Sequence, residues 1–130
     1  MRNTILIADD GFVERRILKA IIRRDFEFYN VTSYIDEYNL RFRLDKTTDD
    51  VALVVTDNNM PNSDEGLEII RDYAPKLIRV PFILVSACVN VDEIAKMAKE
   101  AGAYAFVQKP LHDNKITEVI QNALEKYAKN

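Results

Sequence analysis

The chain has 130 residues, of which 48% are hydrophobic and 30% are charged. This balance excludes a chain that stays disordered for lack of apolar residues, and the length allows one substantial core but not two ordinary domains. The net charge is −3, the pI is about 5.2, and no long basic run occurs, which argues against direct binding to DNA or RNA. We therefore predict a single domain over residues 1–130.

Cysteine content and hydrophobic segments indicate the cellular setting. The single cysteine, Cys88, excludes an internal disulfide and fits a reducing compartment. No apolar stretch reaches the length of a membrane span, and no signal-peptide core precedes the first apolar run. These features predict a cytoplasmic protein that does not bind membranes.

Short runs rich in Val, Ile and Leu alternate with segments of helical periodicity along the whole chain. This alternation is typical of βαβ units and of a mainly parallel sheet, so we predict an α/β fold. The five predicted strands cover residues 4–8, 28–34, 51–56, 81–86 and 104–108.

The segment after the first strand has apolar residues at helical spacing. Val13, Ile17, Ala20 and Ile21 are predicted to face the sheet. The basic residues of the same segment are interpreted as its solvent-exposed face; they are Arg15, Arg16, Lys19, Arg23 and Arg24. This first helix is therefore expected to bury one apolar side.

Two helices are predicted by the same spacing near the C-terminus. The first carries Ile94, Met97, Ala98 and Ala101, and it is predicted to end at Gly102. The apolar residues of the final helix are Ile116, Val119, Ile120, Ala123, Leu124 and Tyr127. Residues 36–50 lack firm periodicity, so we predict only a short or irregular helix there.

Acidic residues follow two of the predicted strands. Asp9 and Asp10 follow the first strand, and Asp57 follows the third. In an open parallel sheet the carboxyl ends of the strands meet at one edge, where ligands bind. Carboxylates gathered there repel one another unless a cation compensates, and Mg²⁺ prefers such oxygen ligands. We therefore predict a magnesium site at this edge.

Two further polar residues are predicted at the same edge. Ser86 ends the fourth strand, and Lys109 follows the fifth. Lys109 can neutralise charge on a transferred phosphoryl group, and Ser86 can donate a hydrogen bond to it. Positioning and electrostatic stabilisation of this kind are what phosphoryl transfer requires.

Four motifs together resemble the receiver domains of two-component signalling. They are Ile-Leu-Ile-Ala-Asp9-Asp10, Val-Val-Thr-Asp57-Asn-Asn-Met60-Pro61, Ile-Leu-Val-Ser86-Ala and Phe106-Val-Gln-Lys109-Pro110. The resemblance covers nearly the whole chain. It implies a doubly wound, flavodoxin-like (βα)5 sandwich with strand order 2-1-3-4-5.

The resemblance also implies roles for individual residues. Asp57 would accept the phosphoryl group, and Mg²⁺ would be bound directly by Asp10, Asp57 and the backbone carbonyl of Asn59, with Asp9 acting through water. The remaining implied roles are a switch pair formed by Ser86 and Phe106 and a cis peptide bond between Lys109 and Pro110.

Partners follow from the same resemblance. A histidine kinase or phosphotransfer protein would supply the phosphoryl group, and phosphorylation would change the surface of the fourth helix, fifth strand and final helix. The domain would be a signalling switch that assists its own phosphorylation and dephosphorylation, and not an enzyme in the usual sense. A downstream protein target, an output domain outside this chain, and a phosphorylation-dependent dimer all remain open.

The sequence departs from the receiver pattern in two places. One extra residue stands between Pro61 and Gly66, which predicts a bulged or mobile loop, and residues 33–50 lack the usual Ala and Gly signature. A pseudo-receiver that works without phosphorylation therefore remains an alternative. A phosphatase with an aspartate nucleophile is disfavoured because Asn59 stands where the second acid would be needed.

Each candidate residue also has an ordinary structural interpretation. Asp9 and Asp10 suit a helix N-terminus, and Phe106 and Cys88 suit a core. His112, after Lys109 and Pro110, is interpreted as a helix-start or surface residue. The functional interpretation is preferred for the site as a whole. The structural interpretation would require every one of these positions to carry its polar residue by chance.

Overall fold

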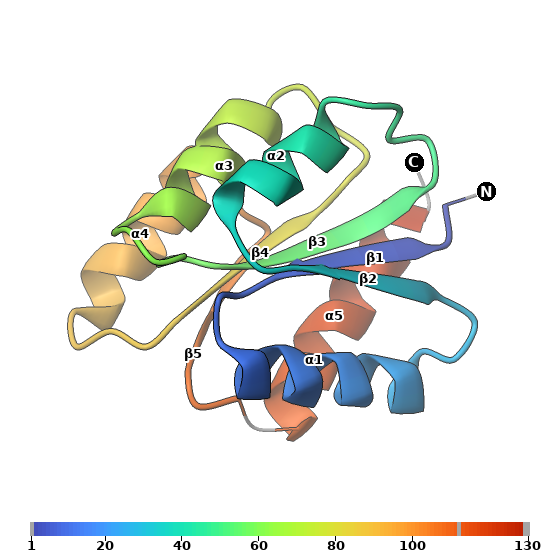
Figure 1. Cartoon of the computed structure of the whole chain (residues 1–130), viewed down its shortest axis with the longest axis horizontal. Helices are drawn as coiled ribbons and strands as arrows, with labels where there is room; N and C mark the ends of the chain where they lie inside the picture. The colour runs from blue at the N-terminus through green and yellow to red at the C-terminus, as the bar shows by residue number, and fades with distance from the viewer. Residues whose placement is uncertain (1, 112, 129–130) are drawn as a thin grey trace.

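The computed structural model describes residues 2–111 and 113–128, in which strands and helices alternate strictly. Their bounds are β1 (Thr4–Ala8), α1 (Phe12–Asp25), β2 (Asn30–Tyr34), α2 (Glu37–Leu44), β3 (Val51–Asp57), α3 (Glu65–Tyr73), β4 (Phe82–Ser86), α4 (Val91–Ala101), β5 (Ala105–Gln108) and α5 (Asp113–Ala128). The strands pair in parallel in the order β2-β1-β3-β4-β5. Helices α2, α3 and α4 cover one face of the sheet, and α1 and α5 cover the other (Figure 1). The predicted doubly wound sandwich is confirmed.

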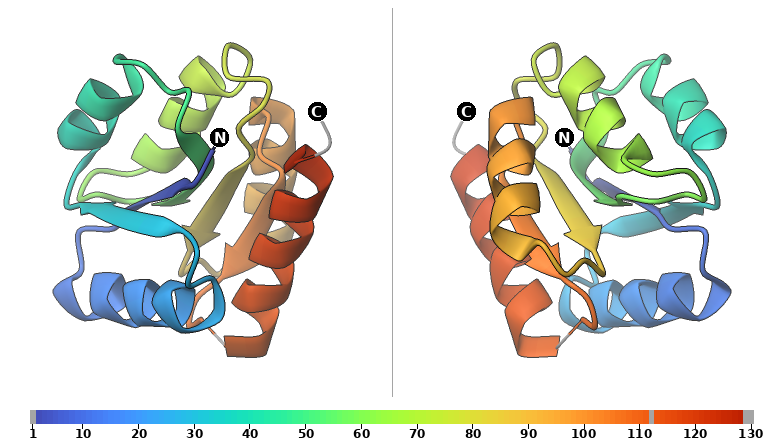
Figure 2. Two further views of the ribbon diagram at one scale, coloured as in Figure 1. Left: turned by 90° about the vertical axis from the view of Figure 1, so that its right-hand side faces the viewer. Right: turned by 90° about the vertical axis from the view of Figure 1, so that its left-hand side faces the viewer.

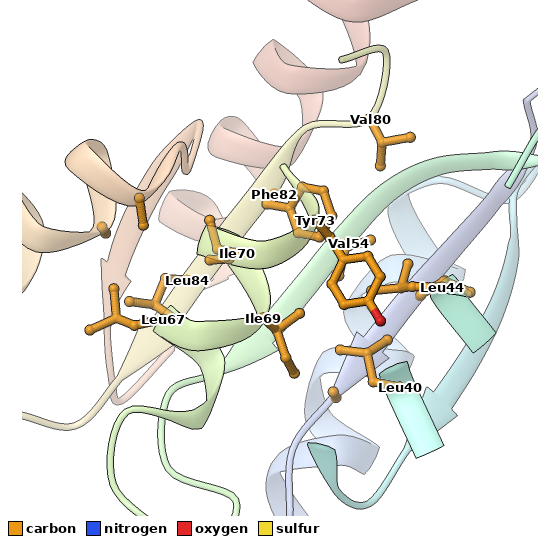
Figure 3. Close-up of a cluster of buried hydrophobic side chains, with 14 of the residues drawn as sticks. Leu40, Leu44, Val54, Leu67, Ile69, Ile70, Tyr73, Val80, Phe82 and Leu84 are labelled. Atoms are coloured by element: carbon orange, nitrogen blue, oxygen red, sulfur yellow. The ribbon is translucent and has the colours of Figure 1, made fainter. Parts of the chain in front are cut away.

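The central strands are buried on both faces, which explains their continuous Val, Ile and Leu runs. Successive residues point to opposite faces, so Leu6 and Val54 join the core under α2, α3 and α4, while Ile5 and Val55 join the core under α1 and α5. Figure 3 shows the first core, with the ring of Tyr73 among aliphatic side chains. The two cores lie on either side of the sheet, which separates the helical layers in both views of Figure 2.

The strand boundaries differ slightly from those predicted. β2 begins at Asn30 because a turn with a hydrogen bond from Tyr29 N to Phe26 O precedes it, and Phe28 is 87% exposed. β4 and β5 each begin one residue later than predicted. β3 extends one residue further and includes Asp57. The acidic residue therefore belongs to the rigid sheet, not to the loop that follows it.

The predicted inward face of α1 is wrong at three of four positions. Val13 and Ile17 are 61% and 46% exposed, and Ala20 is exposed as well. The buried residues of α1 are Leu18, Ile21 and Ile22. Both apolar sets fit helical spacing, and the packing of α1 against the sheet and α5 selects the second. Val13, Ile17 and Ala20 remain as an exposed apolar strip on α1.

The remaining helices follow the predictions. Residues 36–50 contain the short helix α2, whose first turn is capped by the Asp36 carboxylate accepting from Asn39 N at 2.8 Å. The predicted stripes of α4 and α5 are buried or partly buried, and α4 ends at Gly102 with φ of 110°. His112 lies outside the described residues. Within the described part of the chain, no helix combines the length and apolar character needed to span a bilayer.

Candidate functional site

Strand register brings the predicted polar residues to one edge of the sheet. Ala8 pairs with Thr56 and Asp57 pairs with Val85, so the residues after β1 lie beside the end of β3. Ser86 pairs with Gln108, which places Lys109 next to the end of β4. This carboxyl edge, on the left of Figure 1, is where the chain leaves the strands to enter the helices.

Three carboxylates gather at this edge. One carboxylate oxygen each of Asp9, Asp10 and Asp57 lies within 4.8 Å of the other two. Asp9 and Asp57 are buried, with 6% and 7% of their surface exposed, while Asp10 is exposed. A set of hard oxygen ligands that is open to solvent on one side suits Mg²⁺, which keeps several water ligands. The residues present therefore fit the metal that the sequence predicts.

Lys109 neutralises part of this negative charge. Its Nζ lies 2.7 Å from Asp9 Oδ2 and 3.3 Å from Asp57 Oδ1. Burial acts to lower the pKa of Lys109, but its contacts with the two carboxylates outweigh burial, so the pKa is raised. The ammonium therefore stays charged at neutral pH and leaves the three acids with an excess of negative charge.

The pKa of Asp57 is raised from 3.8 to about 6. Burial of the carboxyl group is the main cause, and the negative charge of Asp9 adds to it. Lys109 and a hydrogen bond from the Asn58 backbone act in the opposite direction but do not cancel the shift. The folded protein therefore destabilises the ionised carboxylate of Asp57, and a bound cation would reduce this destabilisation.

The turn between β1 and α1 contains a contact that the sequence did not indicate. The Gly11 N–H donates to Asp9 Oδ1 at 2.8 Å, as expected for an acid before a helix. Arg15 Nη1 donates to the backbone oxygen of Asp9 at 2.8 Å. Arg15 was predicted to belong to the solvated face, but its side chain reaches back to the acidic turn. Helical spacing alone gives no signal for such a contact.

The loop between β3 and α3 is ordered by its own side chains. Asn58 is buried; its Nδ2 donates to Asp64 Oδ1 at 2.9 Å, and its Oδ1 accepts from Leu67 N at 3.1 Å. Asn59 Oδ1 accepts from Asp64 N at 3.0 Å, and Asp64 adopts a left-handed conformation with φ of 63°. The Glu65 carboxylate accepts from Asn62 N at 2.8 Å. The extra residue is thus accommodated in a loop closed by hydrogen bonds.

The remaining predicted residues lie around this centre. Ser86 is buried and Phe106 is partly buried against the core under α4. Ser86, Asn59 and the partly buried Cys88 line a cavity of about 270 Å³ between the β3–α3 and β4–α4 loops. The Lys109–Pro110 peptide bond is cis, and so is Met60–Pro61.

A second cavity lies between α1 and the loop after β5, and Lys109 is part of its lining. It has a volume of about 430 Å³, and its lining includes Val13, Ile17, Lys109, Pro110 and Leu111. The exposed apolar strip of α1 forms one wall, and the loop after β5 forms the other. Lys109 therefore joins this apolar cavity to the acidic pocket, because its ammonium contacts Asp9 and Asp57.

Comparison with known proteins identifies the class to which this site belongs. Residues 5–121 match the family described as response regulator receiver domain, so the chain belongs to that family. It is a phospho-accepting receiver domain of two-component signalling, and such domains are signalling switches that bind Mg²⁺ at an acidic pocket.

Individual relatives support this assignment. The chemotaxis protein CheY of Pseudomonas aeruginosa is 32% identical over 124 residues, which cover 94% of this chain and 96% of that protein. The hydrogenase transcriptional regulatory protein HoxA of Bradyrhizobium diazoefficiens is 25% identical over 129 residues, but this chain spans only 25% of its length. A CheY-like receiver domain protein from Methanospirillum hungatei has the same fold, with a TM-score of 0.84, 21% identity and coverage of 99% and 98% of the two chains.

Proposed function

We propose that Asp57 is the phosphoryl acceptor of this receiver domain in the cytoplasm, with a histidine kinase or a phosphotransfer protein as donor. The observation that carries the proposal is the meeting of three carboxylates with Lys109 at the carboxyl edge of the sheet. Asp57 is the only one of the three acids that belongs to a strand, so its backbone is fixed by the hydrogen bonds of the sheet.

The metal ligands are proposed on the same geometry. Asp10, Asp57 and the backbone carbonyl of Asn59 would bind Mg²⁺ directly, and Asp9 would hold it through water. The bound ion would supply positive charge for the oxygens of the transferred group. Lys109 is positioned to add a second positive charge, since its ammonium already contacts Asp57.

The transfer itself exchanges one bond to phosphorus for another. An oxygen of the Asp57 carboxylate forms a bond to phosphorus while the bond from phosphorus to the donor histidine nitrogen breaks. The nitrogen keeps the electron pair, so the donor regains its unphosphorylated imidazole. Hydrolysis of the resulting acyl phosphate by water would later restore the Asp57 carboxylate, with the same pocket assisting both reactions.

The output is proposed to be a change of surface. The hydroxyl of Ser86 and the ammonium of Lys109 would contact the phosphoryl group, and Phe106 would change its packing against the core under α4. The affected surface consists of α4, β5 and α5, where a protein target, an output domain or a second copy would bind. Ligand contacts of this kind shift a two-state equilibrium only through their preference for one state.

Intact mass after incubation with acetyl phosphate tests the proposed chemistry. We expect a single phosphoryl adduct with Mg²⁺, none in EDTA and none in the Asp57→Asn variant. Asp49→Asn, which removes an exposed carboxylate elsewhere, is the matched control and should form the adduct. A folded wild-type protein without an adduct would favour a pseudo-receiver, and an adduct on Asp57→Asn would place the acceptor elsewhere.

A protein donor is proposed to dock on the exposed strip of α1. Ile17→Gln removes apolar surface from the cavity wall without adding charge, and it should slow transfer from a phosphorylated histidine phosphotransfer protein by about tenfold. Uptake from acetyl phosphate should stay within about twofold, because a small donor needs no docking surface. Ile78→Gln alters a side chain that is 76% exposed outside this strip, and it should leave both rates unchanged. Equal slowing with both donors would place the effect of Ile17→Gln in the acidic pocket.

A further inference from the structure

Arg15 ties the start of α1 back to the turn that carries Asp9 and Asp10. Its Nη1 donates to the backbone oxygen of Asp9 at 2.8 Å, and its own backbone N–H donates to Gly11 O at 3.0 Å. The guanidinium carbon lies 6.0 Å from the centre of the Phe12 ring, and the side chain is only partly exposed. The Arg15 side chain is therefore held by the protein and aimed at the turn.

The other side-chain contacts of this turn are made by the carboxylate of Asp9, which belongs to the acidic pocket. Asp9 Oδ1 accepts from Gly11 N at 2.8 Å, and Asp9 Oδ2 pairs with Lys109 at 2.7 Å. If Lys109 contacts a phosphoryl group on Asp57, as proposed above, Asp9 would lose its contact with Lys109. The bond from Arg15 goes to a backbone oxygen instead, so it does not depend on the state of the carboxylates.

We propose that Arg15 is a positioning residue for Mg²⁺ binding, and this inference rests on the proposed function. The oxygen that Arg15 holds belongs to the peptide unit joining Asp9 to Asp10. Because the peptide unit is planar, fixing it also fixes the position of the Asp10 Cα and narrows the directions in which the exposed Asp10 side chain can leave the backbone. The Asp10 carboxylate then has less freedom to lose when it binds the ion.

A positioning role and a purely electrostatic role of Arg15 predict changes of opposite sign in the affinity for Mg²⁺ when Arg15 is replaced. Arg15 carries a positive charge, and removal of a nearby positive charge strengthens the binding of a cation. Removal of a residue that positions a ligand weakens it. The sign of the change in Mg²⁺ affinity therefore separates a positioning role from a purely electrostatic one, without any measurement of phosphorylation.

Isothermal titration of the unphosphorylated protein with MgCl₂ measures this affinity directly. Arg15→Met keeps the length of the side chain but removes its charge and its donors, and it should weaken Mg²⁺ binding by about five- to tenfold. Arg15→Lys keeps the charge and a donor that reaches the same oxygen, and it should stay within about twofold of wild type. Arg15→Gln is the second neutral variant should the methionine variant not fold. Its side chain has no charge and ends before the position of Arg15 Nη1, so it should lose the bond to Asp9 O and bind Mg²⁺ more weakly than wild type.

Arg16→Met is the matched control. Arg16 is the next residue of α1, and its guanidinium carbon lies 5.6 Å from the same Phe12 ring, but among the described contacts it makes no hydrogen bond to the turn. Its loss should not weaken Mg²⁺ binding. Unchanged or tighter binding in the neutral Arg15 variants would overturn the positioning role. Absence of Mg²⁺ binding in the wild-type protein would instead overturn the proposed metal site.

Discussion

Replacing Gly66 with alanine is expected to lower the free energy of unfolding by about 3 kcal/mol and to weaken Mg²⁺ binding. A Cβ at this position would lie 2.2 Å from the backbone oxygen of Asp57, 2.8 Å from Asn58 Cα and 2.9 Å from Leu84 Cδ1. Two of these atoms belong to the backbone, so the steric overlap can be removed only if α3 moves away from β3. That movement stretches the bond from Gly66 N to Asn58 O, now 2.9 Å, and disturbs the loop beside Asp57.

Gly11→Ala is the matched control for this prediction. A Cβ at Gly11 would lie 2.3 Å from Glu14 Oε1, but that atom is the end of a flexible side chain and can move aside. Gly11 has φ of −83° and ψ of 125°, which alanine adopts without strain. We expect a change below about 1 kcal/mol in urea denaturation. A similar small change for Gly66→Ala would contradict the proposed steric role of Gly66.

Replacing Asp57 with asparagine is expected to stabilise the metal-free protein by about 1 to 3 kcal/mol at neutral pH. Burial and the charge of Asp9 raise the pKa of Asp57 from 3.8 to about 6, so the ionised group opposes folding. Asparagine has nearly the same shape but no charge. Urea denaturation in EDTA at several pH values measures the difference between the two proteins.

The pH dependence of this difference has a defined sign. A carboxyl group whose pKa is raised in the folded state favours folding fully below its unfolded pKa and loses that contribution as the pH rises through the folded value. The advantage of Asp57→Asn should therefore be largest above about pH 6 and disappear below about pH 4. Mg²⁺ should reduce it by stabilising the wild-type protein. An Asp57→Asn variant that is less stable than wild type at neutral pH would contradict the argument.

The alternation of strands and helices could be predicted because it follows from local periodicity. Residues 51–55, for example, are apolar at every position, as a strand buried on both faces requires. The positions of Asp57 and Lys109 at strand ends followed from the same pattern, and the parallel topology then brings them to one edge. The strand order came from family resemblance, because periodicity carries no information about neighbours in a sheet.

The orientation of α1 shows where local pattern stops being sufficient. Both apolar sets of α1 have helical spacing, so sequence alone could not decide whether Val13 and Ile17 or Leu18 and Ile22 face the sheet. The packing of α1 against the sheet and α5 buries Leu18 and Ile22 and leaves the other set exposed beside Lys109. Val13 and Ile17, which were wrongly predicted to be core, line the cavity beside Lys109.

The sequence by itself determined the α/β class, the five strands and the residues that supply charge to the pocket, because these depend on side-chain type and on spacing along the chain. Only the tertiary structure decided how close Lys109 lies to Asp9 and Asp57, which oxygen Arg15 holds and why no side chain fits at Gly66. Those features depend on distances between residues far apart in sequence or on the exact path of the backbone, and burial sets their strength. The pKa of Asp57 is the clearest case, because an aspartate at the end of a strand acquires a value of about 6 only when its neighbours and its burial are in place.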